Sequence, residues 1–97
     1  MVLIMKNFAL ITGAATRIGK AMALSLAKQG VNIAVHYMDS KTEAEEVVTL
    51  AREFGVKACA LRADLLNQKE VRKLIPKAIS EFEEPLNILI NNASIFE

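Results

Sequence analysis

The residues best suited to chemistry in this chain lie near its N-terminus, where positions 12–19 read TGAATRIG. This segment joins an apolar run to a helix-period stretch, a place where backbone amides at a helix N-terminus can hold a pyrophosphate. Gly13 would permit the tight turn, and Gly19 would let the helix approach the sheet and a ligand closely. An ordinary strand-to-helix turn, with small residues for packing, accounts for the same spacing. The segment alone leaves both interpretations open.

A second polar segment, NNAS at positions 91–94, follows the last apolar run. Paired asparagines at a strand end can bridge neighbouring backbone segments, although a turn with side-chain hydrogen bonds explains them equally well. Because the carboxyl ends of parallel strands share one edge of a sheet, we expect this segment to lie beside the glycine segment.

The elements that position these segments alternate at a spacing near thirty residues, which is typical of βαβ units and an α/β fold. Strands are predicted at 8–11, 32–37, 57–62 and 86–90, and helices at about 17–29, from near Ser40, and from Asn67 to Phe82. Right-handed crossovers would give a Rossmann-type parallel sheet of order 3-2-1-4 in a single domain over 1–97. The third helix would stand alone on its face of the sheet, so we expect more chain to follow residue 97. The natural start of the chain is either Met1 or Met5.

Local signals refine these helices. Ser40 and Glu43 form a predicted capping box, Asn67 is a predicted N-cap, and Pro76 should kink or restart the third helix. The predicted buried stripes are Ile18, Ala21, Met22, Ser25 and Leu26 in the first helix, Ala44, Val47, Val48, Ala51 and Phe54 in the second, and Val71, Leu74, Ile75, Ala78, Ile79 and Phe82 in the third.

Three motifs in order resemble the short-chain dehydrogenase/reductase family: TGxxxRIG after the first strand, Ala-Asp-Leu at 63–65 and Asn-Asn-Ala-Ser at 91–94. The resemblance implies an oxidoreductase that transfers a hydride between a nicotinamide and a carbonyl, alcohol or ring C=N. It also implies that Asp64 and Leu65 hold the adenine, unless Asp64 only shapes the turn before the helix. The implied cofactor-binding residues are Gly13, Thr16, Arg17, Ile18, Gly19, Tyr37, Ser40, Asp64, Leu65, Asn92, Ala93 and Ser94.

Arg17 and Ser94 stand where the family usually has glycine. With the His36-Tyr37-x-x-Ser40 pattern and Phe96, they resemble the pteridine-reductase branch. In that branch the arginine lies by the cofactor phosphates and the substrate, and the serine and phenylalanine line the pterin pocket. The resemblance therefore assigns substrate binding to Arg17, Ser94 and Phe96. A solvent-facing residue is the alternative for Arg17, and core packing the alternative for Phe96.

Cofactor choice depends on the end of the second strand, where an acid binds the ribose of NAD and basic or neutral residues accept the 2′-phosphate of NADP. Tyr37 stands at the family's NAD-selecting position, and Ser40, Lys41 and Arg17 add a hydroxyl and positive charge. Asp39 opposes them, because pteridine reductases usually carry arginine there. We expect NADP(H) in preference to NAD(H). The alternative is that Ser40 is only a helix cap and Asp39 only a solvated turn residue.

No catalytic residue is expected in this segment. Tyr37 and Lys41 match the family's Tyr-x-x-x-Lys spacing, but they lie on the adenosine side, whereas the catalytic pair belongs on a later helix. His36 is expected to be structural and Cys59 a small core residue. The intact protein would reduce a pterin-like or carbonyl substrate; the alternative is a module that binds NADP(H) or senses redox state without chemistry.

Composition narrows the remaining possibilities. Twelve basic and eleven acidic residues give a net charge of +1, which offers no basic field for nucleic acid or an anionic membrane. One cysteine and one histidine preclude a disulfide framework and a four-ligand zinc site within one chain. We therefore expect no metal and a cytoplasmic location. We also expect a small-molecule substrate and, from the resemblance, a homo-oligomeric intact protein.

Overall fold

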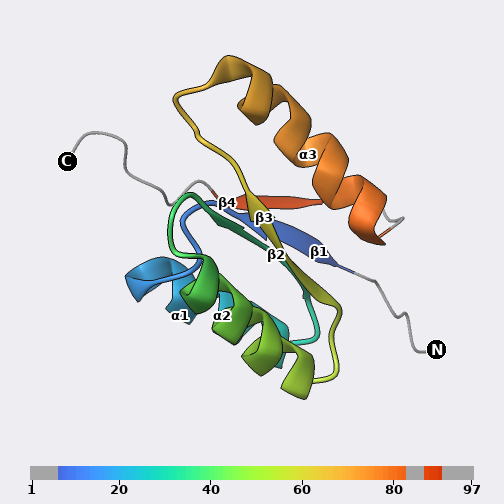
Figure 1. The fold of residues 1–97 in the computed structure, drawn as a ribbon. Helices are drawn as coiled ribbons and strands as arrows, with labels where there is room; N and C mark the ends of the chain where they lie inside the picture. Colours follow the sequence, from blue (N-terminus) through green and yellow to red (C-terminus); the bar gives the residue numbers. More distant parts are fainter. Residues whose placement is uncertain (1–6, 83–86, 91–97) are drawn as a thin grey trace.

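The chain forms a parallel sheet with helices on both faces, and a computed structural model describes residues 7–82 and 87–90 of it (Figure 1). The elements are β1 (Phe8–Ile11), α1 (Arg17–Lys28), β2 (Asn32–Tyr37), α2 (Lys41–Glu53), β3 (Ala58–Arg62), α3 (Gln68–Phe82) and β4 (Ile88–Ile90). The sheet has the order β3-β2-β1-β4, with every pair parallel. The predicted α/β class and strand order are therefore confirmed.

Helices lie on both faces of the sheet, with α1 and α2 on one and α3 on the other (Figure 1), although Leu89 in the edge strand β4 stays 55% exposed. All four residues of β1 are buried, as expected of a central parallel strand. Ile11, Ile33 and Val35 face the α1–α2 side, and Phe8 and Leu10 face α3. The rings of Phe8 and Phe82 meet edge to face at 4.4 Å, which ties the end of α3 to the central strand.

The predicted buried face of α1 is wrong for three of its five residues. Ile18 is 70% exposed, and Ala21 and Ser25 are also exposed, whereas Met22 and Leu26 are partly buried. The buried residues are instead Gly19, Ala23 and Ala27, one every four positions. A stripe without large side chains lets the helix axis lie close to the sheet, so close approach here outweighs the burial of larger apolar side chains.

The second helix matches its predicted stripe in Ala44, Val47, Val48 and Ala51. Phe54 is 49% exposed, contrary to the prediction, because the helix ends at Glu53 and Gly55 turns the chain with a φ of 88°. The predicted capping box is also wrong. Ser40 is the N-cap residue, but its side chain makes no capping hydrogen bond within the described part of the chain.

The third helix begins as predicted after Asn67, whose Oδ1 accepts hydrogen bonds from the amides of Lys69 (3.0 Å) and Glu70 (3.3 Å). It continues through Pro76 as one element, so the predicted restart does not occur. Of the predicted stripe, Leu74, Ala78 and Phe82 are buried. The other three, Val71, Ile75 and Ile79, are 38–40% exposed and lie along the outer flank.

Candidate functional site at the carboxyl edge of the sheet

Hydrogen bonds join the carboxyl ends of all four strands at one edge. The Thr12 amide donates to the Ile90 carbonyl (3.0 Å), which links the segment after β1 to the end of β4. The Ala14 amide donates to the His36 carbonyl, and the Ala63 amide to the Tyr37 carbonyl, each at 3.1 Å. The segments after β1 and β3 are therefore both anchored on the end of β2, as binding at this edge requires.

Two residues of the glycine segment have left-handed backbone. Gly13 has a φ of 62°, which glycine adopts without steric cost. Arg17, the first residue of α1, has a φ of 56° and is the non-glycine residue with positive φ in the described chain. A side chain in this conformation costs free energy, and such residues cluster at functional sites. The structure thus explains why this position suits glycine, and it holds arginine there at a cost.

The N-terminus of α1 is suited to an anion. The Lys20 amide makes the first intrahelical bond, to the Thr16 carbonyl (3.3 Å), so the preceding amides have no carbonyl within the helix. Within the described chain, the Thr16 side chain makes no capping bond, and the first turn contains no acidic residue. Thr16, Arg17 and Ile18 are exposed. Uncapped amides, the positive end of the helix dipole and a guanidinium meet here, as phosphate binding requires.

The other small residues of the segment pack against the protein. Ala14 and Ala15 are buried, and Gly19 packs into the protein under the first turn. The side chains at these three positions are therefore no larger than a methyl group. The burial of Gly19 agrees with the predicted close approach of the helix to the sheet, and the roles of these residues toward a ligand stay predictions.

His36 lies beneath these loops and is 2% exposed. Its Nδ1 accepts a hydrogen bond from the Gly13 amide (3.0 Å), and its Nε2 donates to the Ala63 carbonyl (2.8 Å). Burial lowers the pKa of this imidazole, and the bond to the Ala63 carbonyl offsets the lowering only in part. The predicted structural role agrees with these contacts, but no pattern in the sequence indicated which two loops the ring connects.

The end of β2 carries the residues predicted to select the cofactor. Tyr37 is half-buried and packs against the core on the α1–α2 side, and Asp39 is exposed. Lys41 lies 4.0 Å from Glu45 with both side chains well exposed, so this pair holds the lysine only weakly. Tyr37 and Lys41 thus lie at the end of β2 and the start of α2, the place for which no catalytic role was predicted.

The segment after β3 is held by its own polar contacts. Asp64 Oδ1 accepts from the Leu66 amide (2.9 Å), and the Asp64 amide donates to the Glu70 carboxylate (3.1 Å). The same carboxylate pairs with Arg62 at 2.8 Å. Leu65 is half-buried against the core on the α3 side. These contacts bear out the turn proposed as the alternative for Asp64.

The remaining predicted residues, Asn92, Ala93, Ser94 and Phe96, lie outside the described residues. Ile90, the last described residue, has its carbonyl bonded to Thr12. The described chain therefore ends beside the glycine segment.

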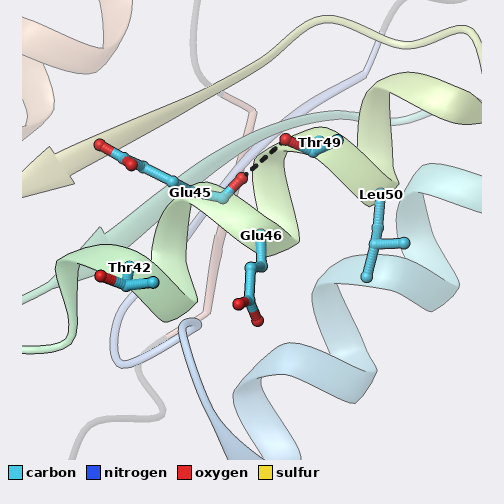
Figure 2. A pocket seen from close by; sticks show the side chains of 5 residues that line it. All are labelled: Thr42, Glu45, Glu46, Thr49 and Leu50. Carbon is cyan, nitrogen blue, oxygen red and sulfur yellow. Dashed lines mark hydrogen bonds between the residues drawn. The ribbon is translucent and has the colours of Figure 1, made fainter.

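Two hollows that described residues line lie away from this edge. One of about 470 Å³ runs along α2, lined by Thr42, Glu45, Glu46, Thr49 and Leu50 (Figure 2). Two glutamates make it unsuited to a phosphate. The other, of about 450 Å³, includes Ala58 and Lys57 at the amino end of β3, away from the carboxyl edge. No described helix is long and apolar enough to cross a membrane, and the described residues hold no cluster of three metal-ligating side chains.

Comparison with known proteins agrees with this geometry. The family model described as short chain dehydrogenase matches residues 7–97. The chain is 42% identical over 91 residues to the 3-oxoacyl-[acyl-carrier-protein] reductase FabG of Staphylococcus aureus (strain N315), covering 94% of this chain and 37% of the reductase. It is 41% identical over 92 residues to the short-chain dehydrogenase/reductase homolog YusS of Bacillus subtilis, covering 95% of this chain and 84% of the homolog.

Solved structures give the same answer. A short chain dehydrogenase from Burkholderia cenocepacia in complex with NADP matches with a TM-score of 0.88 and 36% identity, over 94% of this chain and 37% of that one. FolM alternative dihydrofolate reductase 1 from Brucella suis, also in complex with NADP, matches with a TM-score of 0.86 and 37% identity over the same shares.

This chain spans about 37% of the length of the FabG reductases it matches. Within that length, the family model covers the sheet, the glycine segment and the residues that follow β4. The chain therefore belongs to the short-chain dehydrogenase family.

Proposed function

We propose that this chain is the cofactor-binding first part of an NADP(H)-dependent oxidoreductase. The single observation that carries the proposal is the start of α1, where uncapped amides lie beside Arg17 at a φ of 56°. An arginine held in an unfavourable conformation at an anion-binding helix start favours a phosphate-rich ligand. Structures of similar proteins in complex with NADP support the choice of dinucleotide.

Three parts of the cofactor would have residues to receive them. The amides of 17–19 would hold the pyrophosphate, and the guanidinium of Arg17 would neutralise phosphate charge. Asp64 and Leu65 would take the adenine. Tyr37, Ser40 and Lys41 would surround the 2′-phosphate of the ribose. Bound NADPH would supply the hydride, and these residues would orient it.

The proposed substrate is a pterin-like heterocycle or a carbonyl compound. The similarity to an alternative dihydrofolate reductase supports a ring C=N acceptor, and Arg17 at the usual glycine position suits that substrate class. The similarity to 3-oxoacyl reductases supports a carbonyl. In either case Ser94 and Phe96 would line the substrate site beside the nicotinamide.

The test is calorimetric titration of the chain with NADPH and with NADH at low salt, together with an assay for NADPH oxidation. Saturable binding that is at least about fivefold tighter for NADPH supports the proposal, because only NADPH carries the 2′-phosphate. Equal affinity for the two would sink the assignment of NADP(H). Turnover of NADPH by the 97 residues would contradict the placement of catalysis outside this segment.

A non-catalytic NADP(H)-binding or redox-sensing module is the second candidate. The described residues fit both candidates, because Tyr37, the single tyrosine of the 97 residues, lies at the end of β2 and the catalytic pair of an oxidoreductase is expected on a later helix. The sequence encoded after residue 97 would distinguish the two candidate functions. A Tyr-x-x-x-Lys pair on a later helix supports the oxidoreductase, and its replacement supports the module.

A further inference from the structure

The imidazole of His36 bridges two loops that flank the proposed nucleotide site. On one side its Nδ1 accepts from the Gly13 amide at 3.0 Å, where the glycine segment begins. On the other side its Nε2 donates to the carbonyl of Ala63 at 2.8 Å, one residue before Asp64. The ring is 2% exposed, so protein groups rather than water meet both nitrogens.

These two partners fix the protonation state of the ring. A carbonyl can only accept, so Nε2 must carry the hydrogen that it donates to Ala63. A backbone amide can only donate, so Nδ1 must be the unprotonated nitrogen. The neutral Nε2–H tautomer satisfies both bonds at once. A second proton, on Nδ1, would point at the Gly13 amide hydrogen and break that bond.

We propose that His36 is a positioning residue that holds the glycine segment at a fixed distance from the segment after β3, and that its protonation releases Gly13 and weakens cofactor binding. The consequence for the cofactor rests on the proposed function. The pyrophosphate and the adenine would be held by the two segments that the imidazole joins. A dinucleotide that spans both is therefore sensitive to their spacing.

Charged side chains nearby make their described hydrogen bonds elsewhere. Arg62 donates to the Glu70 carboxylate and the Met38 carbonyl, and Asp64 accepts from the Leu66 amide. Asp39 and Arg17, at the end of β2 and the start of α1, are exposed. Within the described chain, none of these groups hydrogen-bonds the imidazole, so a proton on it would be a buried charge without a bonded carboxylate. Burial accordingly lowers the pKa of His36.

Three substitutions separate the two bonds. In His36→Asn, the Oδ1 atom stands as many bonds from the backbone as the histidine Nδ1 and can accept from Gly13 without titrating. In His36→Gln, the side-chain nitrogen can reach the Ala63 carbonyl, but the acceptor for Gly13 is lost. In His36→Phe, both bonds are lost from a ring of similar size.

The measurement is NADPH affinity of the full chain at pH values from 8 to 5, for the wild type and these variants. At pH 8, His36→Phe should bind about three- to tenfold more weakly than His36→Asn, the range expected for one further lost hydrogen bond. His36→Gln should also bind more weakly than His36→Asn, because the bond that it loses is the one to the glycine segment, which would hold the pyrophosphate. As the pH falls, wild-type affinity should decline more steeply than that of His36→Asn. The 2′-phosphate also titrates near pH 6, and the asparagine variant measures that background.

Parallel pH profiles for the wild type and His36→Asn would overturn the proposal, as would equal affinities for the asparagine and glutamine variants. If the wild type binds no NADPH at pH 8, the proposed function fails. In that case, hydrogen exchange of the Gly13 amide tests the positioning role of His36 without the cofactor. Protection of this amide that is lost in His36→Gln and kept in His36→Asn supports that role, and equal protection in both variants refutes it.

Discussion

Arg17 combines an unfavourable backbone conformation with a charge at the proposed phosphate site. Its φ of 56° is one that glycine adopts freely and that costs another residue about 1–2 kcal/mol. The resemblance to pteridine reductases assigned function to this arginine, and the exposed start of α1 fits that role. The cost of the conformation and the benefit to binding can be separated by mutation.

Arg17→Gly should raise the free energy of unfolding by about 0.5–1 kcal/mol, the conformational cost of arginine less the entropy that glycine loses on folding. The same change should weaken NADPH binding about tenfold, because a charge-assisted bond is lost. Urea denaturation and calorimetry measure the two effects. Arg17→Lys is the control, because it keeps the charge and the backbone cost. A glycine variant that binds as tightly as wild type would remove Arg17 from the site.

Asp39 is the residue that opposes NADP(H). Asp39→Asn should raise NADPH affinity about two- to fivefold at low salt, since an exposed carboxylate repels the 2′-phosphate by a screened interaction of up to about 1 kcal/mol. NADH affinity should stay unchanged, because NADH lacks that phosphate. Glu53→Gln, an equal charge change at the far end of α2, is the matched control. An equal gain for NADH and NADPH would show that Asp39 does not face the 2′-phosphate.

At the scale of elements, the sequence predicted more of the fold than of its packing. Strand positions followed from apolar runs and glycine breaks, which depend on local composition. Strand order followed from the rule of right-handed crossovers. The buried face of α1 did not, because the prediction favoured large apolar residues such as Ile18, whereas close approach selected Gly19, Ala23 and Ala27. A search for small residues every four positions would have found that face.

The candidate site shows the same division. The motifs identified the glycine segment and Asp64, whose neighbours in sequence shape them. His36 is 23 positions from Gly13 and 27 positions from Ala63, and only the assembled sheet brings the three residues together. Cross-strand contacts of this kind leave no periodic signal in a single sequence.

Pro76 is tolerated inside α3 at a cost. It cannot donate to the carbonyl four residues earlier, yet the helix continues because Leu74, Ala78 and Phe82 remain packed on the sheet. Pro76→Ala should therefore raise the free energy of unfolding by about 1–2 kcal/mol, after allowance for the greater freedom of the unfolded chain. Chemical denaturation checks this. The neighbouring exposed substitution Lys77→Ala should change stability by less than about 0.5 kcal/mol, and a similar gain in both would discount the proline.

At the scale of the whole molecule, Cys59 reports whether the sheet and α3 stay assembled. Burial first, and then the carboxylate of Glu81, raise the pKa of this thiol to about 12, against 9.0 ordinarily, while Arg52 acts in the opposite sense. The thiolate content at pH 8 is then roughly a thousandfold lower in the folded chain than in the unfolded one.

Reaction of Cys59 with dithionitrobenzoate at pH 8 should be at least about 100-fold slower in buffer than in concentrated urea, and the urea midpoint of reactivity should match that of circular dichroism. The raised pKa also stabilises the fold below about pH 9, and this stability is lost as the pH rises from 9.0 towards 12, because the unfolded thiol ionises first. Fast reaction in buffer would mean that β3 is open to solvent.

A nicotinamide dinucleotide bound at the carboxyl edge of the sheet would be detected by an NMR titration of the 15N-labelled chain with NADPH. The amides of Arg17, Ile18, Gly19 and Asp64 should show saturable shifts, with Glu45 and Thr49 on the outer face of α2 unmoved. Shifts confined to α2, or none in a chain whose spectrum is dispersed and folded, would contradict binding at this edge.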